Sequence, residues 1–220
     1  MVLSTSEVRA FYDRFGKKQD TQGFYENPAL DDLIVHGNFS EAEKVFEFGC
    51  GTGRFAALLL EKYLPPSATY VGFDLSPTMI GLATKRLVPY ADRVQVILSD
   101  GAIKFSLPDN SADRVVSTYV LDLLSEEDIR SFFREAHRVL IPDGKLGLIS
   151  LTRGKTLLSR LVTFLWTALY RWRASLVGGC RPISLEDHDL DPNDWEPEYQ
   201  KVVISFGVPS EVSILTKKPS

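Results

Sequence analysis

The chain has 220 residues, and its hydrophobic share of 44% and charged share of 25% are typical of one folded globular domain. A formal net charge of −4 gives no overall positive field, so no nucleic-acid partner is expected. The longest apolar run, residues 161–170, is shorter than the roughly 20 residues that a membrane-spanning helix needs.

The N-terminal part of the chain carries helix signals. The capping box Ser4-x-x-Glu7 predicts a first helix, and Gly16 stands where that helix is expected to end. Pro28 and the apolar residues after it predict a second helix over residues 29–36. We therefore interpret residues 1–44 as a helical lid that precedes the first strand.

Short apolar strands alternate with helices in the middle of the chain. The expected strands are residues 45–48, 69–73, 93–98, 114–118 and 145–151, and the expected helices are residues 54–63, 76–88 and 125–140. This alternation predicts parallel βαβ units with helices on both faces of the sheet. Residues 45–151 are expected to form this α/β core.

The C-terminal part breaks the alternation. A long apolar helix is expected near residues 156–176 and an acidic loop after it, so residues 152–200 are interpreted as a cap helix and loop. Two short runs follow, joined by Gly207-Val208-Pro209, which is typical of a hairpin. Residues 201–220 are therefore expected to add an antiparallel strand at the sheet edge, within the single domain that residues 1–220 form.

A glycine-rich turn, Glu47-Phe48-Gly49-Cys50-Gly51-Thr52-Gly53, joins the first expected strand to the next helix. Glycines there permit a tight turn and a close approach of the backbone to a ligand, and the helix N-terminus favours an anionic group. The G-x-G-x-G spacing differs from the dinucleotide fingerprint G-x-G-x-x-G, because Arg54 stands where that pattern needs glycine. A plain strand-to-helix turn is the alternative interpretation.

Acidic residues end the next two expected strands. Asp74 can accept both ribose hydroxyls of an adenosyl group, and the carboxylate of Asp100, which precedes Gly101, can accept its adenine amino group. A helix cap at Asp74 and a simple Asp-Gly turn at Asp100 are the alternatives. Because ligands of open α/β sheets bind at the carboxyl ends of the strands, the three motifs together favour one adenosyl site.

Residues 47–53, Asp74, Asp100 and the segment 113–121 resemble the ordered motifs of class I S-adenosylmethionine (SAM)-dependent methyltransferases. The resemblance covers about residues 45–151. It implies a Rossmann-like, seven-stranded, mostly parallel sheet with an antiparallel last strand, and SAM as the cofactor, with S-adenosyl-L-homocysteine as its product. The implied cofactor-binding residues are Glu47, Gly49, Cys50, Gly51, Thr52, Gly53, Asp74, Leu75, Met79, Asp100, Gly101, Tyr119 and Val120.

The sulfonium methyl group of SAM is already activated, so orientation of the two substrates can suffice and a dedicated base is optional. The candidates for catalysis are Tyr119, beside the transferring methyl group, and Asp122, as a general base. For Asp122 a solvated loop or cap residue is the alternative. Tyr12 and Tyr25 are expected either to close over the site or to pack the N-terminal helices on the core.

The apolar helix at 156–176 has three competing interpretations. It is a core or cap helix, a lid over an apolar substrate pocket, or an interfacial helix that makes peripheral contact with an anionic membrane. Residues 152–185 contain no acidic side chain, whereas Arg153, Lys155 and Arg160 are among their basic ones. Trp166 and Arg181 are the candidate substrate residues of this region, beside Tyr12 and Tyr25.

The sequence therefore predicts a SAM-dependent methyltransferase acting on a small, hydrophobic molecule that is aromatic, quinone-like or a lipid. The segment 11–15 and the long helix after the fifth strand more narrowly resemble small-molecule methyltransferases of ubiquinone and menaquinone biosynthesis. A protein methyltransferase, a catalytically silent SAM-binding subunit and a nicotinamide oxidoreductase are the alternatives. The last of these is opposed by the glycine spacing.

The two cysteines, Cys50 and Cys180, form no Cys-x-x-Cys pair, and no secretory signal precedes them. They are expected to be free thiols in a cytoplasmic protein. No histidine or cysteine cluster has the spacing of metal ligands, so no metal site is expected.

Overall fold

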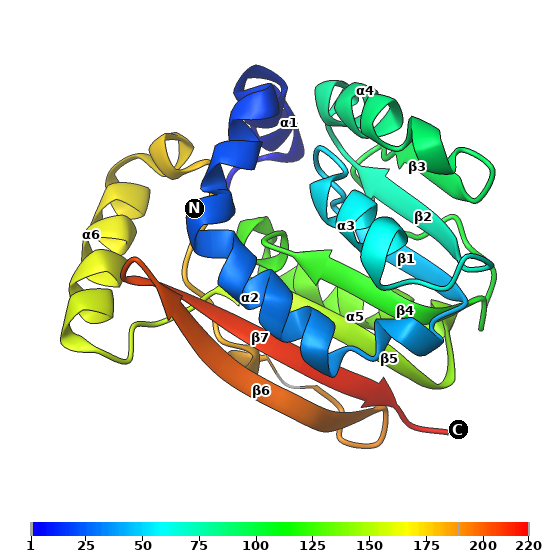
Figure 1. Cartoon of the computed structure of the whole chain (residues 1–220). Helices are drawn as coiled ribbons and strands as arrows, with labels where there is room; N and C mark the ends of the chain where they lie inside the picture. The colour runs from blue at the N-terminus through cyan, green and yellow to red at the C-terminus, as the bar shows by residue number, and fades with distance from the viewer. Residues whose placement is uncertain (1, 189, 220) are drawn as a thin grey trace.

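The computed structural model describes residues 2–188 and 190–219, and its centre is a seven-stranded sheet with the order β3-β2-β1-β4-β5-β7-β6 (Figure 1). β1 to β5 pair in parallel, whereas β7 runs antiparallel to both of its neighbours. The predicted Rossmann-like sheet with an antiparallel last strand is confirmed. The strands are β1 Lys44–Phe48, β2 Thr69–Asp74, β3 Val94–Leu98, β4 Ala112–Thr118, β5 Leu140–Leu151, β6 Trp195–Ser205 and β7 Val208–Lys217.

Helices cover both faces of the sheet. In Figure 1, α2 and α3 lie in front of the sheet, α5 lies behind it, and α6 stands at the left beside the turn between β6 and β7. A 3-10 segment, Gly16–Gln22, connects α1 to α2. The helices are α1 Thr5–Phe15, α2 Gly23–His36, α3 Arg54–Lys62, α4 Pro77–Arg86, α5 Glu126–Val139 and α6 Leu157–Arg173.

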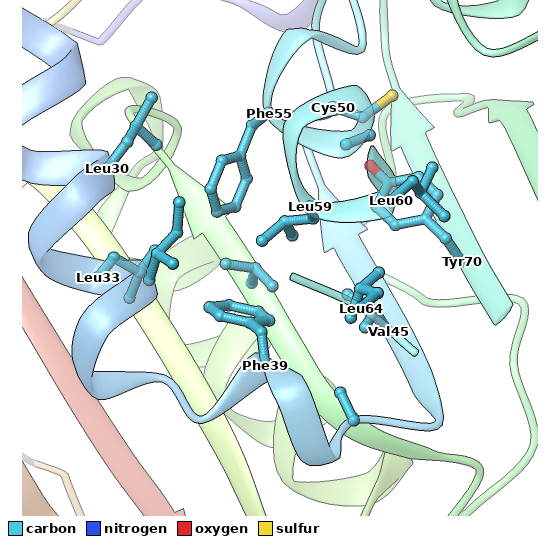
Figure 2. Packing of buried hydrophobic residues seen from close by; sticks show 14 of the residues in the cluster. Leu30, Leu33, Phe39, Val45, Cys50, Phe55, Leu59, Leu60, Leu64 and Tyr70 are labelled. Atoms are coloured by element: carbon cyan, nitrogen blue, oxygen red, sulfur yellow. The ribbon is translucent and has the colours of Figure 1, made fainter. Parts of the chain in front are cut away.

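Alternate residues of β1 face two separate cores, because successive side chains of a strand point to opposite faces. Val45 belongs to the core under α2 and α3, where Leu33 and Leu59 are fully buried (Figure 2). Phe48 belongs to the core under α5, and its ring lies 5.4 Å from that of Phe132. These two cores hold the carboxyl ends of the parallel strands in fixed positions.

α2 begins at Gly23 rather than at residue 29, and Pro28 lies inside it. Proline has no N–H with which to bond the carbonyl four residues earlier, here that of Phe24. The hydroxyl of Ser205 donates to this carbonyl at 3.3 Å, so the hairpin partly replaces the missing helical bond. The predicted start was wrong because the compensating group lies far away in the chain.

The hairpin is longer than predicted. β6 begins at Trp195, inside the acidic segment, because the ring of Trp195 is buried beside that of Phe133. Phe206 and Gly207 form the turn with φ angles of 50° and 82°, the positive pair that a type I′ hairpin needs. β7, the last strand of the chain, lies between β5 and β6, and the edge of the sheet is therefore formed by β6.

Two separate glycine-to-alanine substitutions, one in the turn and one in a helix, test the geometry of this turn. Gly207→Ala should lower the free energy of unfolding by about 1 kcal/mol, because an alanine is strained at positive φ. Its Cβ would also lie 3.1 Å from the Val162 side chain. Gly81→Ala, at an exposed helical site with open space around it, should instead raise stability by about 0.5–1 kcal/mol. Urea unfolding measures both values, and two changes of the same sign would contradict the assigned turn.

Candidate functional site

Three adjoining cavities lie at the carboxyl end of the parallel strands. We name them the strand-end cavity, beside Asp74 and Gly101, the turn cavity, beside Cys50 and Gly51, and the apolar cavity, beside Trp166. Tyr119 lines all three. This residue therefore marks the point at which the three spaces meet.

The strand-end cavity collects predicted cofactor residues from three strands. Its lining includes Gly49, Asp74, Leu75, Gly101, Tyr119 and Val120. The positive φ of Gly49, 85°, lets the turn pass close to β4, where a Cβ would overlap the Val120 side chain. Only glycine therefore fits at this position of the turn.

Asp74 links the glycine turn to the end of β2. One carboxylate oxygen accepts the amide of Gly51 and the other that of Ser76, each at 2.8 Å. Burial raises the pKa of Asp74 to about 6, while these amide bonds oppose that rise. An ionised carboxylate has about four acceptor positions, so Asp74 can still accept two ligand hydroxyls.

The turn cavity holds the second group of predicted cofactor residues. Glu47, Cys50, Gly51 and Thr52 line it together with Gly49 and Tyr119. Glu47 accepts the Tyr70 hydroxyl, and burial raises the pKa of Glu47 to about 7. The Thr52 hydroxyl donates to Asp20 at 2.6 Å and accepts from Arg86, so it already has two protein partners.

Three predicted cofactor residues do not line these cavities. Gly53 caps α3, where its close neighbour is the Ala83 backbone, and Met79 is buried in α4. The Asp100 side chain is exposed, and its carboxylate accepts the Ala102 amide at 2.9 Å. For Asp100 this geometry matches the alternative of a simple Asp-Gly turn, and it is Gly101 that lines the strand-end cavity.

The N-terminal segment covers the strand-end cavity. Arg9 donates to the Leu75 carbonyl at 3.1 Å, and Asp13 accepts the amide of Thr78 at 3.2 Å. These bonds fix α1 across the ends of β2 and β3, where Val8 and Tyr12 face the cavity. This position suits the predicted lid.

Gln19 is a site residue that the sequence did not reveal. It lies in the 3-10 segment, lines all three cavities and faces Gly51. Its buried Oε1 has no hydrogen-bond partner among the described residues. Because a buried unpaired acceptor is costly, this atom is suited to receive a donor from a ligand. A lone glutamine in a polar run carries no sequence signal for such a role.

The apolar cavity has a volume of about 520 Å³ and lies between the N-terminal helices, α6 and the strand ends. Tyr12, Tyr25 and Trp166, three of the predicted substrate residues, line it. The Trp166 indole donates to the Cys180 carbonyl at 3.0 Å, which fixes its ring. The structure thus brings together side chains from three distant segments.

Arg181, the fourth predicted substrate residue, does not line this cavity. Its guanidinium donates to the Asp122 carbonyl at 3.2 Å and lies near the Glu126 carboxylate. Its backbone amide bonds the same carbonyl at 3.1 Å. Arg181 therefore holds the loop after β4 in place.

Tyr119 has a left-handed backbone, with φ of 57°, at the end of β4. Its hydroxyl lies 2.9 Å from that of Ser210 in β7. Left-handed geometry is uncommon for residues other than glycine and is found at functional sites. This geometry is consistent with the predicted place of Tyr119 at the reacting centre.

Asp122 lines the apolar cavity and is 0% exposed, so the interpretation as a solvated loop residue is wrong. Its Oδ1 has no partner among the described residues, and burial raises the pKa of Asp122 to about 7.

Glu26, which the sequence did not reveal, lines the same cavity and pairs with Arg54 at 2.7 Å. Burial also raises the pKa of Glu26 to about 7.

Comparison with known proteins agrees with this geometry. Residues 45–144, which include the glycine turn, Asp74 and Tyr119, match a family described as a methyltransferase domain. A malonyl-[acyl-carrier protein] O-methyltransferase from Marinomonas sp. is 27% identical over 65% of this chain and 51% of its own length. A demethylmenaquinone methyltransferase from Lactobacillus johnsonii is 33% identical over 46% of this chain and 40% of its own.

A solved structure matches the fold more widely. The N-methyltransferase NodS from Bradyrhizobium japonicum, in complex with S-adenosyl-L-homocysteine, has a TM-score of 0.66 over 88% of both chains, at 17% identity. That likeness concerns the fold alone. In sequence, this chain spans about half the length of the curated relatives it matches.

The buried Asp122 predicts a pH-dependent loss of stability. Its pKa rises from 3.8 to about 7 on folding, so its favourable contribution is present below about pH 4 and is lost by about pH 7. The free energy of unfolding, relative to Asp122→Asn, should thus fall over this range by on the order of 4 kcal/mol. Urea unfolding at pH 4 to 8 measures this difference.

Asp100→Asn, at an exposed position, provides the matched control, measured over the same pH range. Parallel pH profiles for Asp122→Asn and the wild type would contradict the burial of an ionisable Asp122.

Proposed function

We propose that this chain is a class I SAM-dependent methyltransferase that transfers the methyl group of SAM to a small hydrophobic acceptor, as its domain match and its fold support. The observation that carries the proposal is the meeting of two unlike spaces at Tyr119. One space contains the glycine turn and Asp74, and the other is enclosed mainly by apolar and aromatic side chains.

The residues around the strand-end and turn cavities fit SAM. Asp74 has acceptor positions left for the ribose hydroxyls, and Gly101 leaves room for the adenine at the end of β3. Gly49 and Gly51 let the backbone approach the methionine moiety, and the unpaired Gln19 Oε1 can accept from its amino group. SAM supplies the activated methyl group, which the chain has to orient.

The apolar cavity fits an acceptor with an apolar body and one protic group. Val162, Leu165 and Leu169 would contact the body, while the unpaired Asp122 Oδ1 would face the group that loses a proton. A pKa of about 7 leaves Asp122 partly ionised at neutral pH, as a general base requires. Tyr119 would align the acceptor with the methyl group from the boundary of the cavities.

The named relatives support a small-molecule acceptor. One is named for demethylmenaquinone and another for malonyl-[acyl-carrier protein], and they match this chain over 101 and 144 residues respectively. Because those two acceptors differ, we assign a chemical class to the acceptor and no single compound. An aromatic or quinone-like molecule with a hydroxyl group fits both the apolar lining and the buried carboxyl group.

Asp74 provides a test of donor binding. Asp74→Ala should weaken SAM binding by about tenfold to a hundredfold, since hydrogen bonds to a charged group contribute roughly 1.5–3 kcal/mol each. Asp100→Ala should leave SAM binding unchanged, because Asp100 is exposed and bonds its own turn. Calorimetric titration with SAM and S-adenosyl-L-homocysteine measures both, and circular dichroism checks folding. Equal affinities in folded Asp74→Ala and wild type would refute the ribose role.

Asp122 provides a test of acceptor chemistry. With hydroxylated aromatic and quinol acceptors, S-adenosyl-L-homocysteine release should rise with pH through about 7, the pKa of Asp122. Asp122→Asn should lower kcat by about 10²-fold or more without weakening SAM binding. Turnover of soluble amines or peptides alone would overturn the hydrophobic acceptor. SAM binding without any turnover would instead identify a silent subunit.

A further inference from the structure

α6 carries an exposed apolar ridge on its outer side. Leu157, Phe164 and Trp172 are 86%, 69% and 79% exposed, and Leu161 lies between them. Their spacing of three, four or eight residues places them on one side of the helix. Only Ser159 of α6 is buried, so of the interpretation as a core or cap helix the core part is wrong. Water-exposed apolar area of this kind marks a contact surface.

The ridge continues onto the neighbouring hairpin turn. A Cβ on Gly207 would contact Leu158 and Val162, so this turn packs against α6 (Figure 1). Phe206 of the same turn is 78% exposed, and its ring lies 5.4 Å from that of Phe24. We call these residues the apolar patch: Phe24, Leu157, Leu158, Leu161, Phe164, Trp172 and Phe206.

Unpaired cations border the patch. Lys155, Arg160, Arg171 and Arg173 are exposed and form no ion pair with any residue in the described ranges. Arg160 and Arg171 are eleven residues apart, which places them on the same side of the helix beside the ridge. The whole chain carries a net charge of −4, yet residues 152–185 contain no acidic side chain. The positive charge is therefore concentrated around the apolar patch.

We propose that α6 and the hairpin turn dock on an anionic lipid bilayer. The ridge would enter the boundary between headgroups and acyl chains, and the arginines would contact lipid phosphates, as in interfacial helices. Within the described residues, no helix combines the length and the apolar character needed to cross a bilayer. A second copy of this chain fits less well, because two basic helices would repel each other.

Docking would place the bilayer beside the apolar cavity. Val162, Leu165, Trp166 and Leu169, on the inner side of α6, line that cavity. One helix would thus contact lipid on its outer side and the acceptor on its inner side. A lipid-soluble acceptor could then enter without crossing water; this step rests on the proposed function, whereas docking does not.

Vesicle binding by the whole chain tests the proposal. We expect it to sediment with phosphatidylglycerol–phosphatidylcholine vesicles at least tenfold more tightly than with pure phosphatidylcholine, and less tightly at high salt. Trp172 is a built-in reporter, whose emission should shift to the blue on binding. Trp172→Phe should remove that shift, since Trp195 is buried and Trp166 lines the cavity.

Paired variants separate the apolar and the charged contributions. Leu161→Ser/Phe164→Ser should weaken vesicle binding at least tenfold, and Arg160→Glu/Arg171→Glu should abolish the preference for anionic vesicles. Val35→Ser/Val88→Ser, which changes equally exposed apolar residues outside the patch, should bind as the wild type does. Circular dichroism of each variant checks folding, and none of these residues lines any of the three cavities described above.

Three results would overturn docking. The first is no binding of the wild type to anionic vesicles. The second is that Leu161→Ser/Phe164→Ser binds vesicles as tightly as the wild type does. The third is a dimer of the wild type in light scattering that the Leu161→Ser/Phe164→Ser variant does not form. The last result would identify a second copy as the occupant of the patch. Because vesicle binding is measured without SAM or acceptor, its failure is distinguishable from a failure of methyl transfer.

Discussion

Three backbone donors of the glycine turn bind the end of β2, and the rest of the site depends on this attachment. The amides of Gly49 and Cys50 both reach the Phe73 carbonyl, and that of Gly51 reaches the Asp74 carboxylate, each at 2.8 Å. The chain follows this path because Gly49 has no Cβ to overlap Val120. One set of bonds thus shapes the turn, orients a carboxylate and brings the ends of β1 and β2 together.

Burial gives the site its acid–base character. Glu26, Glu47, Asp74 and Asp122 line the three cavities, and burial raises the pKa of each toward neutrality. Buried carboxyl groups oppose folding once they ionise, so the two apolar cores have to offset their cost. In return, Asp122 has a pKa suited to proton transfer near neutral pH. The buried carboxyl groups thus lower the stability of the fold and, at the same time, have pKa values near neutral pH.

Segments outside the βαβ core build the walls of the site. Arg9 and Asp13 fix α1 over the strand-end cavity, and α6 closes the apolar cavity with Trp166. The core therefore carries the glycine turn and the strand ends, whereas the flanking helices enclose the apolar cavity. α6 has two different environments, because its inner side lines a cavity and its outer side, with Phe164, faces solvent.

The sequence by itself determined the features with short-range causes: the cap at Ser4, the strand–helix alternation, the glycine spacing and the carboxylate of Asp74 at a strand end. Only the tertiary structure decided which side chains face a cavity. It buried Asp122, brought Gln19 and Glu26 into the site, turned Asp100 away, allowed a helix through Pro28 and left α6 exposed. Burial and compensating hydrogen bonds depend on partners far away in the chain, such as Ser205 for α2, and no local pattern records them.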